Sequence, residues 1–225
     1  QVPYKHLGPE EIPAEVARLM EAEKVIGVHH GRMEYGPRAL GHRSIIGDAR
    51  SKKMQRIMNV KIKFRESFRP FAPSVMEEKV NEFFDFHHPS PYMLLVYDVV
   101  DDKRLDVAEA IKNAKGLEKL EIPRSVVPAI THVDWSARVH TVNEKVNPFY
   151  YNILRAFYQK TGCPVIINTS FNVRGEPIVQ SPEDAFKVFQ NTDMDYLLLE
   201  GFLIEKKEED RQKIDYEWIK TFPLD

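Results

Sequence analysis

The sequence PVIINTSFN, residues 164–172, decides the class of fold because it joins a short apolar run to a polar end. The β-branched run at 165–167 follows a proline and predicts a buried β-strand. The polar residues begin where this strand ends. Hydrogen-bonding side chains are therefore expected at the end of a buried strand.

On both sides of this strand, segments whose apolar residues have helical spacing alternate with short apolar segments typical of strands. Helices are predicted over residues 13–23, 51–61 (with Ser51 as cap), 148–161 and from the start signal SPED at 181–184. Strands are predicted at 25–30, 92–100 and 196–204, the last as a strand pair, and the charged segment 101–121 is expected to be an insertion, a mobile hairpin or a solvated helix. Because no repeat or linker separates these elements, we expect one α/β or α+β domain over residues 1–225, with a mixed sheet.

The composition narrows the possible functions. The 225-residue chain has 43% hydrophobic residues and a formal net charge of -2, so bulk attraction to nucleic acid or acidic lipid is not expected. Its single cysteine, Cys163, forms no intrachain disulfide, and no apolar stretch is long enough for a membrane span or a secretory signal. We therefore expect a cytoplasmic protein. Because the chain begins at Gln1, we also expect a fragment of a longer protein.

Positive charge is concentrated in one segment, GRMEYGPRALGHRSIIGDARSKKMQRIMNVKIKFRESFRPFAP, residues 31–73, which holds eleven Lys and Arg residues against three acidic ones. Prolines and phenylalanines at 64–73 predict an irregular, tightly packed loop. Rigidly held arginines and lysines are typical of an anion site.

Two short spacings indicate which residues meet the anion. Lys63 and Arg65 lie two apart, and so do Ser170 and Asn172 after the apolar strand. In extended segments such pairs project to the same side. Lysine and arginine suit phosphate oxygens, whereas serine and asparagine fix orientation through hydrogen bonds. The combination favours a nucleotide triphosphate, although both spacings are common in proteins.

Structural interpretations remain open for several residues. The loop arginines Arg38, Arg43 and Arg69 can pair with acids or cap carbonyls, and the glycines form no known phosphate-loop pattern. The pairs His29-His30 and His87-His88 lack metal-ligand spacing, and Cys163 is expected to be a packed residue, so no metal site is predicted.

Four ordered blocks resemble a known family: GRMEYGPRALGHRSIIGDAR, KFRESFRPFAPSV, VIINTSFNVRGEPIVQSPEDA and TDMDYLLLEGFLI. They are similar to the C-terminal domain of the O-carbamoyltransferases of nodulation-factor and antibiotic biosynthesis. The resemblance implies a YrdC-like fold, an open twisted mixed β-sheet flanked by helices, shared with threonylcarbamoyl-adenylate synthases. In that fold the K-x-R and S-x-N pairs form the nucleotide-binding signature, matched here by Lys63, Arg65, Ser170 and Asn172.

The resemblance also implies an activity: carbamoyl-adenylate formation from carbamoyl phosphate and ATP, with Mg²⁺ accompanying the nucleotide. A separate N-terminal domain, which contains iron, would then transfer the carbamoyl group to an acceptor. Within this chain we assign Arg38, Lys63 and Arg69 to carbamoyl phosphate and the reacting phosphoryl region. The nucleotide side is assigned to Arg65, Asn168, Ser170 and Asn172.

One block departs from the family pattern. This chain has HVDWSARVHTV at 132–142, where the family often has HVDGTARVQTV. Trp135 stands in place of a glycine, and His140 in place of a glutamine. Arg138, between them, is a candidate substrate contact.

Two other functions share parts of this pattern. Threonylcarbamoyl-adenylate synthesis would use the same signature pairs with bicarbonate and threonine, from which no inorganic phosphate is released. RNA binding would use the basic segment for phosphate contacts and would depend strongly on salt, although its aromatic residues are not interleaved for base stacking.

Overall fold

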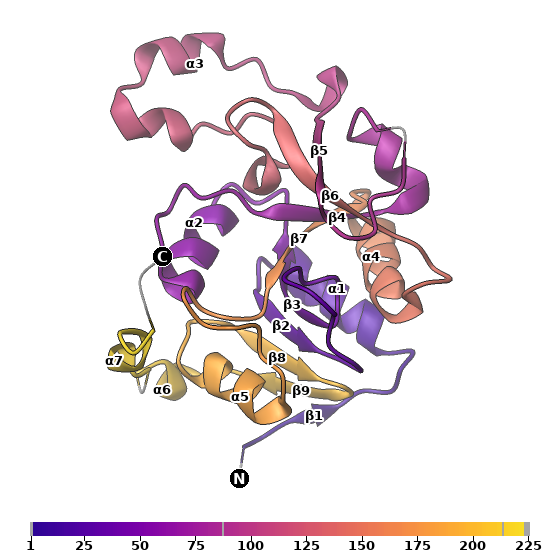
Figure 1. Cartoon of the computed structure of the whole chain (residues 1–225), viewed down its shortest axis with the longest axis vertical. Coiled ribbons are helices and arrows are strands. Elements are labelled where there is room, and N and C mark those ends of the chain that lie inside the picture. The colour runs from indigo at the N-terminus through magenta and orange to yellow at the C-terminus, as the bar shows by residue number, and fades with distance from the viewer. Residues whose placement is uncertain (1, 87, 213, 223–225) are drawn as a thin grey trace.

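The structure is a computed structural model that describes residues 2–86, 88–212 and 214–222, so His87 of the second histidine pair lies outside it. Within these residues the chain forms one nine-stranded sheet in the order β1-β9-β8-β2-β3-β7-β4-β6-β5 (Figure 1). The strands are Lys5–His6 (β1), Ile26–His29 (β2), Arg43–Asp48 (β3), Ala72–Met76 (β4), Leu95–Asp98 (β5), Ser136–Val142 (β6), Val165–Ser170 (β7), Tyr196–Leu199 (β8) and Phe202–Glu205 (β9). Strands β2 and β8 are parallel, as are β4 and β6, and the other neighbours are antiparallel. The predicted mixed sheet is confirmed.

The helices connect these strands. They are Ile12–Glu21 (α1), Met54–Met58 (α2), Ala108–Asn113 (α3), Pro148–Thr161 (α4), Pro182–Gln190 (α5), Glu208–Arg211 (α6) and Tyr216–Ile219 (α7). A π-helical turn follows α2 at Asn59–Lys63 (η1), and short 3₁₀ helices occupy Glu77–Glu82 (η2), Asp101–Lys103 (η3), Gly116–Leu120 (η4) and Pro128–Ile130 (η5). None of the described helices combines the length and apolar character needed to cross a bilayer.

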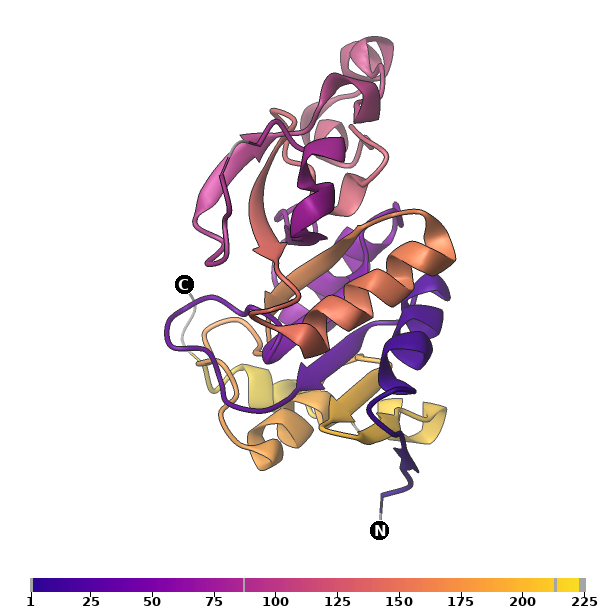
Figure 2. The same cartoon turned by 90° about the vertical axis from the view of Figure 1, so that its right-hand side faces the viewer.

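The two faces of the sheet are covered by different helices. Helices α1 and α4 pack against each other and against β3, β4 and β7, and Figure 2 shows them side by side. Helix α2 covers the opposite face at β3, where a Cβ on Gly47 would touch Met54 and Met58. Gly27 points to that same face, because it lies opposite Ile45 in the β2–β3 ladder and Ile45 is two residues from Gly47. There a Cβ would collide with Phe171, so Gly27 admits a close aromatic neighbour.

Local capping chemistry explains the two best-predicted helices. Helix α4 has the predicted bounds 148–161, and the Asn147 side chain accepts a hydrogen bond from the Tyr150 amide. Helix α5 begins at the predicted start signal, where Ser181 and Asp184 form a capping box in which each accepts a hydrogen bond from the other's amide. The segment 101–121 contains only short helical turns, and Figure 1 shows α3 projecting away from the sheet, as expected for an insertion.

Two local predictions are wrong, and strands β1, β3, β4 and β6 were not predicted. The helix predicted over 51–61 is regular only over α2, because its last turns widen into η1. Ser51 is not its N-cap, since that position belongs to Lys53, and the Ser51 hydroxyl donates instead to Glu23 Oε1 at 2.6 Å. Strand β3 was not predicted, because its residues follow a glycine-rich turn and show no alternation: all six are buried.

Candidate functional site

Two adjoining cavities lie at the end of β7. The large basic cavity, of about 390 Å³, is lined by Lys63, Arg65, Arg69, Ser170, Asn172, Val173, Arg174, Gly175, Glu176 and Pro177. The small basic cavity, of about 130 Å³, is lined by Pro37, Arg38, Ala39, Arg65, Pro70, Phe71, Ala72, Met93, Arg138, Asn168, Thr169 and Ser170. Arg65 and Ser170 line both cavities. The structure therefore brings together all eight residues proposed from the sequence, but it groups Arg38 with Asn168 rather than with Lys63 and Arg69.

The turn after α2 brings Lys63 and Arg65 to the large cavity. The predicted extended geometry is wrong here: Phe64 is left-handed (φ 51°), and the Arg65 amide donates to the Asn59 carbonyl at 3.0 Å. Both side chains still reach the cavity, because the left-handed residue reverses the chain at the end of the π turn. The two basic residues thus converge through a turn rather than through strand alternation.

Lys63 is almost completely buried, with 4% of its surface exposed. Its ammonium group lies close to four oxygens, the Ser170 carbonyl (2.5 Å) and hydroxyl (3.3 Å) and the Asn172 carbonyl (2.9 Å) and Oδ1 (2.8 Å). Burial lowers the pKa of Lys63 well below its usual value, and Arg65 lowers it further. In this structure Lys63 therefore holds the S-x-N segment in place as one wall of the cavity.

Arg65 and Arg69 also line the large cavity. The Arg65 guanidinium donates to Asn59 Oδ1 at 2.6 Å and lies 4.9 Å from the centre of the Phe71 ring. Burial is the main cause that lowers the pKa of Arg65 to about 10, and nearby Arg69 adds to it. Arg69 forms an ion pair with Glu66 at 2.8 Å, and the same carboxylate lies 3.9 Å from Arg174. One carboxylate therefore faces two of the arginines.

The S-x-N segment is shaped by the end of the sheet. Ser170 is the last β7 residue paired with β3, opposite Ser44, and the chain then turns. The turn is closed by Asn172, whose amide group donates to the Glu176 carbonyl at 2.6 Å, and by the Glu176 carboxylate, which accepts from the Val173 amide at 3.1 Å. Burial raises the pKa of Glu176. These contacts fix the two polar side chains at the cavity wall.

Arg38 and Arg138 face the small cavity from different elements. Arg38 belongs to the loop between β2 and β3, whereas Arg138 lies in β6 opposite Val96 of β5. Each has a buried Nε–H without a hydrogen-bond partner, and neither forms an ion pair with any described residue. Burial lowers the pKa of Arg138, and the charge of Arg38 contributes. Two uncompensated guanidinium groups in one cavity create a strong preference for an anion.

A buried polar network holds Asn168, one of the residues that line this cavity. The Asn168 amide nitrogen donates to the Ala39 carbonyl and to the Ser74 hydroxyl, both at 2.9 Å. Ser74 also contacts His140 Nδ1 at 2.8 Å and the Tyr150 hydroxyl at 3.1 Å. These four side chains are at least 96% buried, so the network holds Asn168 rigidly.

The two departures from the family pattern have structural explanations. Trp135 adopts a left-handed conformation (φ 64°), the region that glycine occupies most readily, so the tryptophan is accommodated at a backbone position suited to glycine. His140 takes part in the buried network, where burial lowers its pKa to about 3 and keeps the ring neutral. Both residues therefore shape the strand that carries Arg138.

Glu34 is a site residue that sequence reasoning missed. Its Oε1 accepts from the amides of Leu40 (2.7 Å) and His42 (2.8 Å), and it lies 3.4 Å from the Arg43 amide. These contacts close the loop that carries Arg38. The only sequence signal is an acid inside the basic segment, which does not reveal backbone contacts six to nine residues away.

Arg43 has the structural role that the sequence left open. It is 4% exposed and donates to the carbonyls of His30, Gly31, His42 and Gln180. Its guanidinium group is therefore occupied in joining the β2–β3 loop to the start of α5.

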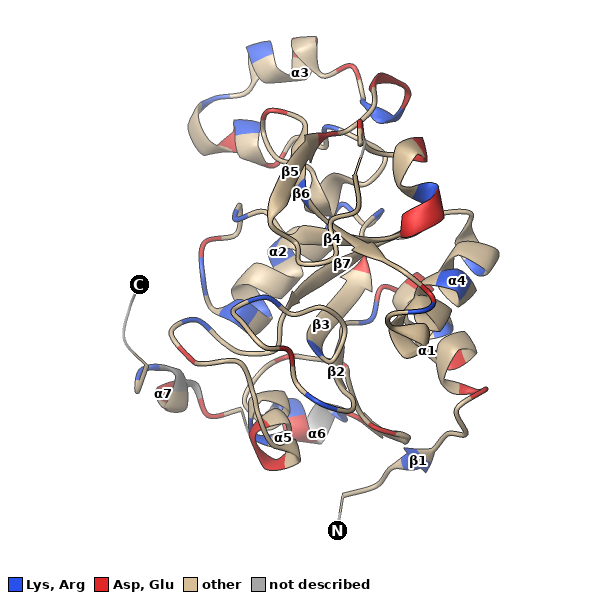
Figure 3. Cartoon of the chain, turned by 45° about the vertical axis from the view of Figure 1, so that its right-hand side comes forward, with Lys and Arg blue, Asp and Glu red and all other residues tan. Residues whose placement is uncertain are grey.

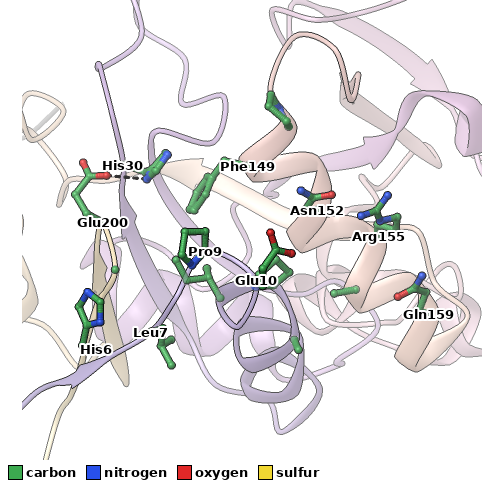
Figure 4. Close-up of a pocket in the computed structure, with 16 residues that line it drawn as sticks. His6, Leu7, Pro9, Glu10, His30, Phe149, Asn152, Arg155, Gln159 and Glu200 are labelled. Atoms are coloured by element: carbon green, nitrogen blue, oxygen red, sulfur yellow. Dashed lines mark ion pairs between the residues drawn. The ribbon is translucent and has the colours of Figure 1, made fainter.

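A larger cavity, of about 650 Å³, lies elsewhere, between α1, α4 and the β8–β9 turn (Figure 4). His30 stacks on Phe149 with ring centres 3.6 Å apart and pairs with Glu200 at 2.8 Å. None of the predicted site residues lines this cavity, so its size does not make it the anion site.

Residues 17–206 match the family described as "Carbamoyltransferase C-terminus". The chain belongs to this family. This carbamoyltransferase C-terminal domain is 52% identical over 225 residues to an uncharacterised protein of Synechocystis, covering 100% of the chain and 37% of that relative. It is 41% identical to "Nodulation protein NolO" of Bradyrhizobium diazoefficiens, covering 88% of the chain and 33% of the relative. The chain thus spans about a third of these longer relatives.

The fold of this carbamoyltransferase C-terminal domain also has a counterpart among solved structures. It is similar to a region of the "full-length HypF in the phosphate- and nucleotide-bound form", with a TM-score of 0.50 and 17% identity, covering 88% of this chain and 22% of that one. The likeness concerns the fold, and it confirms the predicted YrdC-like open mixed sheet.

Charge elsewhere on the carbamoyltransferase C-terminal domain is mixed. Lys and Arg occur on many elements and are interspersed with Asp and Glu (Figure 3). An extended face of one sign is the usual footprint of nucleic-acid binding. The concentrated positive charge instead lines two cavities of limited volume, which favours small anions.

Proposed function

We propose that this domain forms carbamoyl-adenylate from carbamoyl phosphate and ATP. The observation that supports it best is the pair of adjoining basic cavities that share Arg65 and Ser170. A cavity of about 390 Å³ lies in the range of sites for molecules of nucleotide size, whereas one of about 130 Å³ suits a much smaller anion. Two cavities of unequal size that meet at shared residues suit two anions that must react with each other.

In this proposal the reaction has two balanced steps. Water breaks the P–O bond of carbamoyl phosphate, giving inorganic phosphate and carbamate. A carbamate oxygen then attacks the α-phosphorus of ATP, the α–β anhydride bond breaks, and pyrophosphate leaves. No side chain becomes covalently attached, so the protein acts by positioning two anions and stabilising the charge that develops on phosphoryl oxygens.

We assign Arg38 and Arg138 to the carbamoyl phosphate and Arg69 and Asn172 to the nucleotide. Arg65 lies between the two groups and is suited to the transferring α-phosphoryl group, because its planar guanidinium can bridge oxygens of both reactants. Lys63 keeps the S-x-N wall in position. This division follows the cavities, and it differs from the sequence-based one in moving Asn168 toward carbamoyl phosphate and Lys63 and Arg69 toward ATP.

Magnesium fits this arrangement as a companion of ATP. Of the described residues lining the large cavity, Glu176 alone has a carboxylate, and Mg²⁺ is commonly held by one or two carboxylates together with substrate phosphates. When bound, the ion would neutralise charge on the phosphate oxygens. Glu176 would hold it while keeping the turn at Val173 closed.

The final carbamoyl transfer belongs, in this proposal, to another part of a longer protein. This chain spans 37% and 33% of two relatives, so those proteins have ample sequence for a separate transferase region with its own iron. In this proposal that transferase region would select the acceptor of the carbamoyl group.

The test is calorimetric titration of Mg·ATP and of carbamoyl phosphate into this chain, followed by measurement of phosphate and pyrophosphate release. We expect binding of both ligands, loss of carbamoyl phosphate binding in Arg38→Ala, and no loss in Arg32→Ala, because Arg32 is exposed in the same loop. Equal release of phosphate and pyrophosphate distinguishes this reaction from threonylcarbamoyl-adenylate synthesis. A folded parent chain that binds neither ligand would refute the proposal.

A further inference from the structure

One carboxylate stands between two arginines of the large basic cavity. Glu66 Oε2 pairs with Arg69 Nε at 2.8 Å, and its other oxygen, Oε1, lies 3.9 Å from Arg174 Nη1. Both arginines line the cavity, whereas Glu66 does not. Each oxygen of one anionic group thus faces a different guanidinium, an arrangement that two oxygens of a phosphate group can reproduce.

The carboxylate joins two turns that are far apart in the chain. Arg69 belongs to the turn after η1 and Arg174 to the turn after β7, and the Arg174 amide donates to the Lys63 carbonyl at 3.2 Å. This backbone contact holds the two turns together without Glu66, so the ion pair is not needed to build the cavity. Glu66 is exposed, and exposed side chains change rotamer within nanoseconds. The carboxylate can therefore leave the arginines without any repacking of the core.

Glu66 carries a full negative charge at neutral pH. A hydrogen bond from its own backbone amide is the main cause that lowers the pKa of Glu66, and the charges of Arg69 and Arg174 lower it further. The contact compensates positive charge of the cavity, so an incoming phosphate group has to compete with an ionised carboxylate.

We propose that Glu66 is a built-in competitor of the nucleotide: its carboxylate occupies the place of a phosphate group between Arg69 and Arg174, and a polyphosphate binds by displacing it. The proposal rests on the proposed function and adds to it a feature that selects the length of the ligand. A single anionic group that only replaces Glu66 exchanges one anion for another at these arginines and gains little. A polyphosphate also extends to other groups that line the cavity, such as Ser170 and Asn172, and its net affinity comes from them.

The expected size of the effect follows from the kind of contact. The apparent dissociation constant of the ligand equals its intrinsic value divided by the fraction of molecules whose arginines are free of Glu66. Exposed ion pairs lower such a fraction only a few-fold. Removing the carboxylate should therefore tighten polyphosphate binding about two- to fivefold.

The test is calorimetric titration of pyrophosphate and, separately, of a non-hydrolysable ATP analogue with Mg²⁺ into the parent chain and into Glu66→Gln. We expect both ligands to bind about two- to fivefold more tightly to the variant. Carbamoyl phosphate, which we assign to the small cavity, should bind equally to both proteins. Glu144→Gln is the matched control, because it also removes an exposed carboxylate from an arginine, Arg155, and should leave all three affinities unchanged.

A second background separates direct competition from a general effect of charge. In Arg69→Ala, which lacks the closer partner of Glu66, the substitution Glu66→Gln should tighten pyrophosphate binding much less than it does in the parent chain. Equal tightening in both backgrounds overturns the proposal, because a general charge effect does not depend on Arg69.

The remaining outcomes separate this proposal from the proposed function. Unchanged or weaker binding of pyrophosphate and of the ATP analogue by Glu66→Gln overturns the role of Glu66 and leaves adenylation intact. Failure of the parent chain to bind any of the three ligands overturns both. Glu66→Ala is the second variant, and it should tighten binding in the same range as Glu66→Gln.

Discussion

Replacing His140 with Gln should make the folded protein less sensitive to acid. His140 is 4% exposed, and burial lowers its pKa from the usual 6.5 to about 3. Between these two values the unfolded chain binds a proton that the folded chain does not bind. Stability is therefore lost as the pH falls through 6.5 toward 3, which is the sign expected for a basic group whose pKa is lowered on folding.

The size of the effect follows from the same shift. Each pH unit below 6.5 lowers the free energy of unfolding by about 1.4 kcal/mol until His140 also titrates in the folded protein. At pH 5 the loss that His140 causes is therefore about 2 kcal/mol. A glutamine side chain does not titrate in this range, and its amide can still accept a hydrogen bond from Ser74. Whatever the variant costs at pH 7.5, its free energy of unfolding should improve by about 2 kcal/mol relative to the parent at pH 5.

The assay is urea unfolding of both proteins, followed by circular dichroism at pH 7.5 and pH 5.0. His88→Gln is the matched control, because His88 is exposed and has no part in the buried network. Parallel losses of stability in the parent and in His140→Gln would show that His140 is not held neutral.

The remaining predictions concern the site and its supports. Arg138→Ala should lower the rate of pyrophosphate release about a hundredfold in a coupled pyrophosphate assay. By calorimetry, its thermal unfolding midpoint should change as little as it does in a typical surface substitution. Lys63→Met should lower the free energy of unfolding, measured with urea, by about 2–3 kcal/mol, because the Ser170 and Asn172 carbonyls lose their buried donor. An unchanged urea midpoint would contradict this. Lys206→Met should cost a similar amount, since Lys206 donates to three carbonyls at the end of α5. Glu34→Ala should weaken carbamoyl phosphate binding by calorimetry, with ATP binding unchanged, because it removes the acceptor of the Leu40 and His42 amides and so loosens the loop that carries Arg38.

Local chemistry explains which elements could be predicted. Helix α4 and helix α5 have sequence-local caps and apolar spacing, and β7 is a β-branched run between a proline and polar residues. Strand β3 could not be predicted in this way, because it is buried on both faces and follows a glycine-rich turn. The π turn at η1 also escaped prediction, since its residues continue the helical pattern of α2.

By itself, the sequence determined the family, the mixed α/β architecture and eight of the residues that line the basic cavities, because these depend on residue types and short spacings. Only the tertiary structure decided how those residues are grouped. Arg38, Arg138 and Asn168 meet because β3, β7, β4 and β6 are successive neighbours in the sheet although they are far apart in the chain, a register that no local pattern encodes. The same fold surrounds the Lys63 ammonium with oxygens of Ser170 and Asn172 and leaves the side-chain Oδ1 of Asn168 unpaired. The hydrogen-bond partners of a side chain depend on which groups the fold places beside it. The role of each residue within the site is therefore decided only in the tertiary structure.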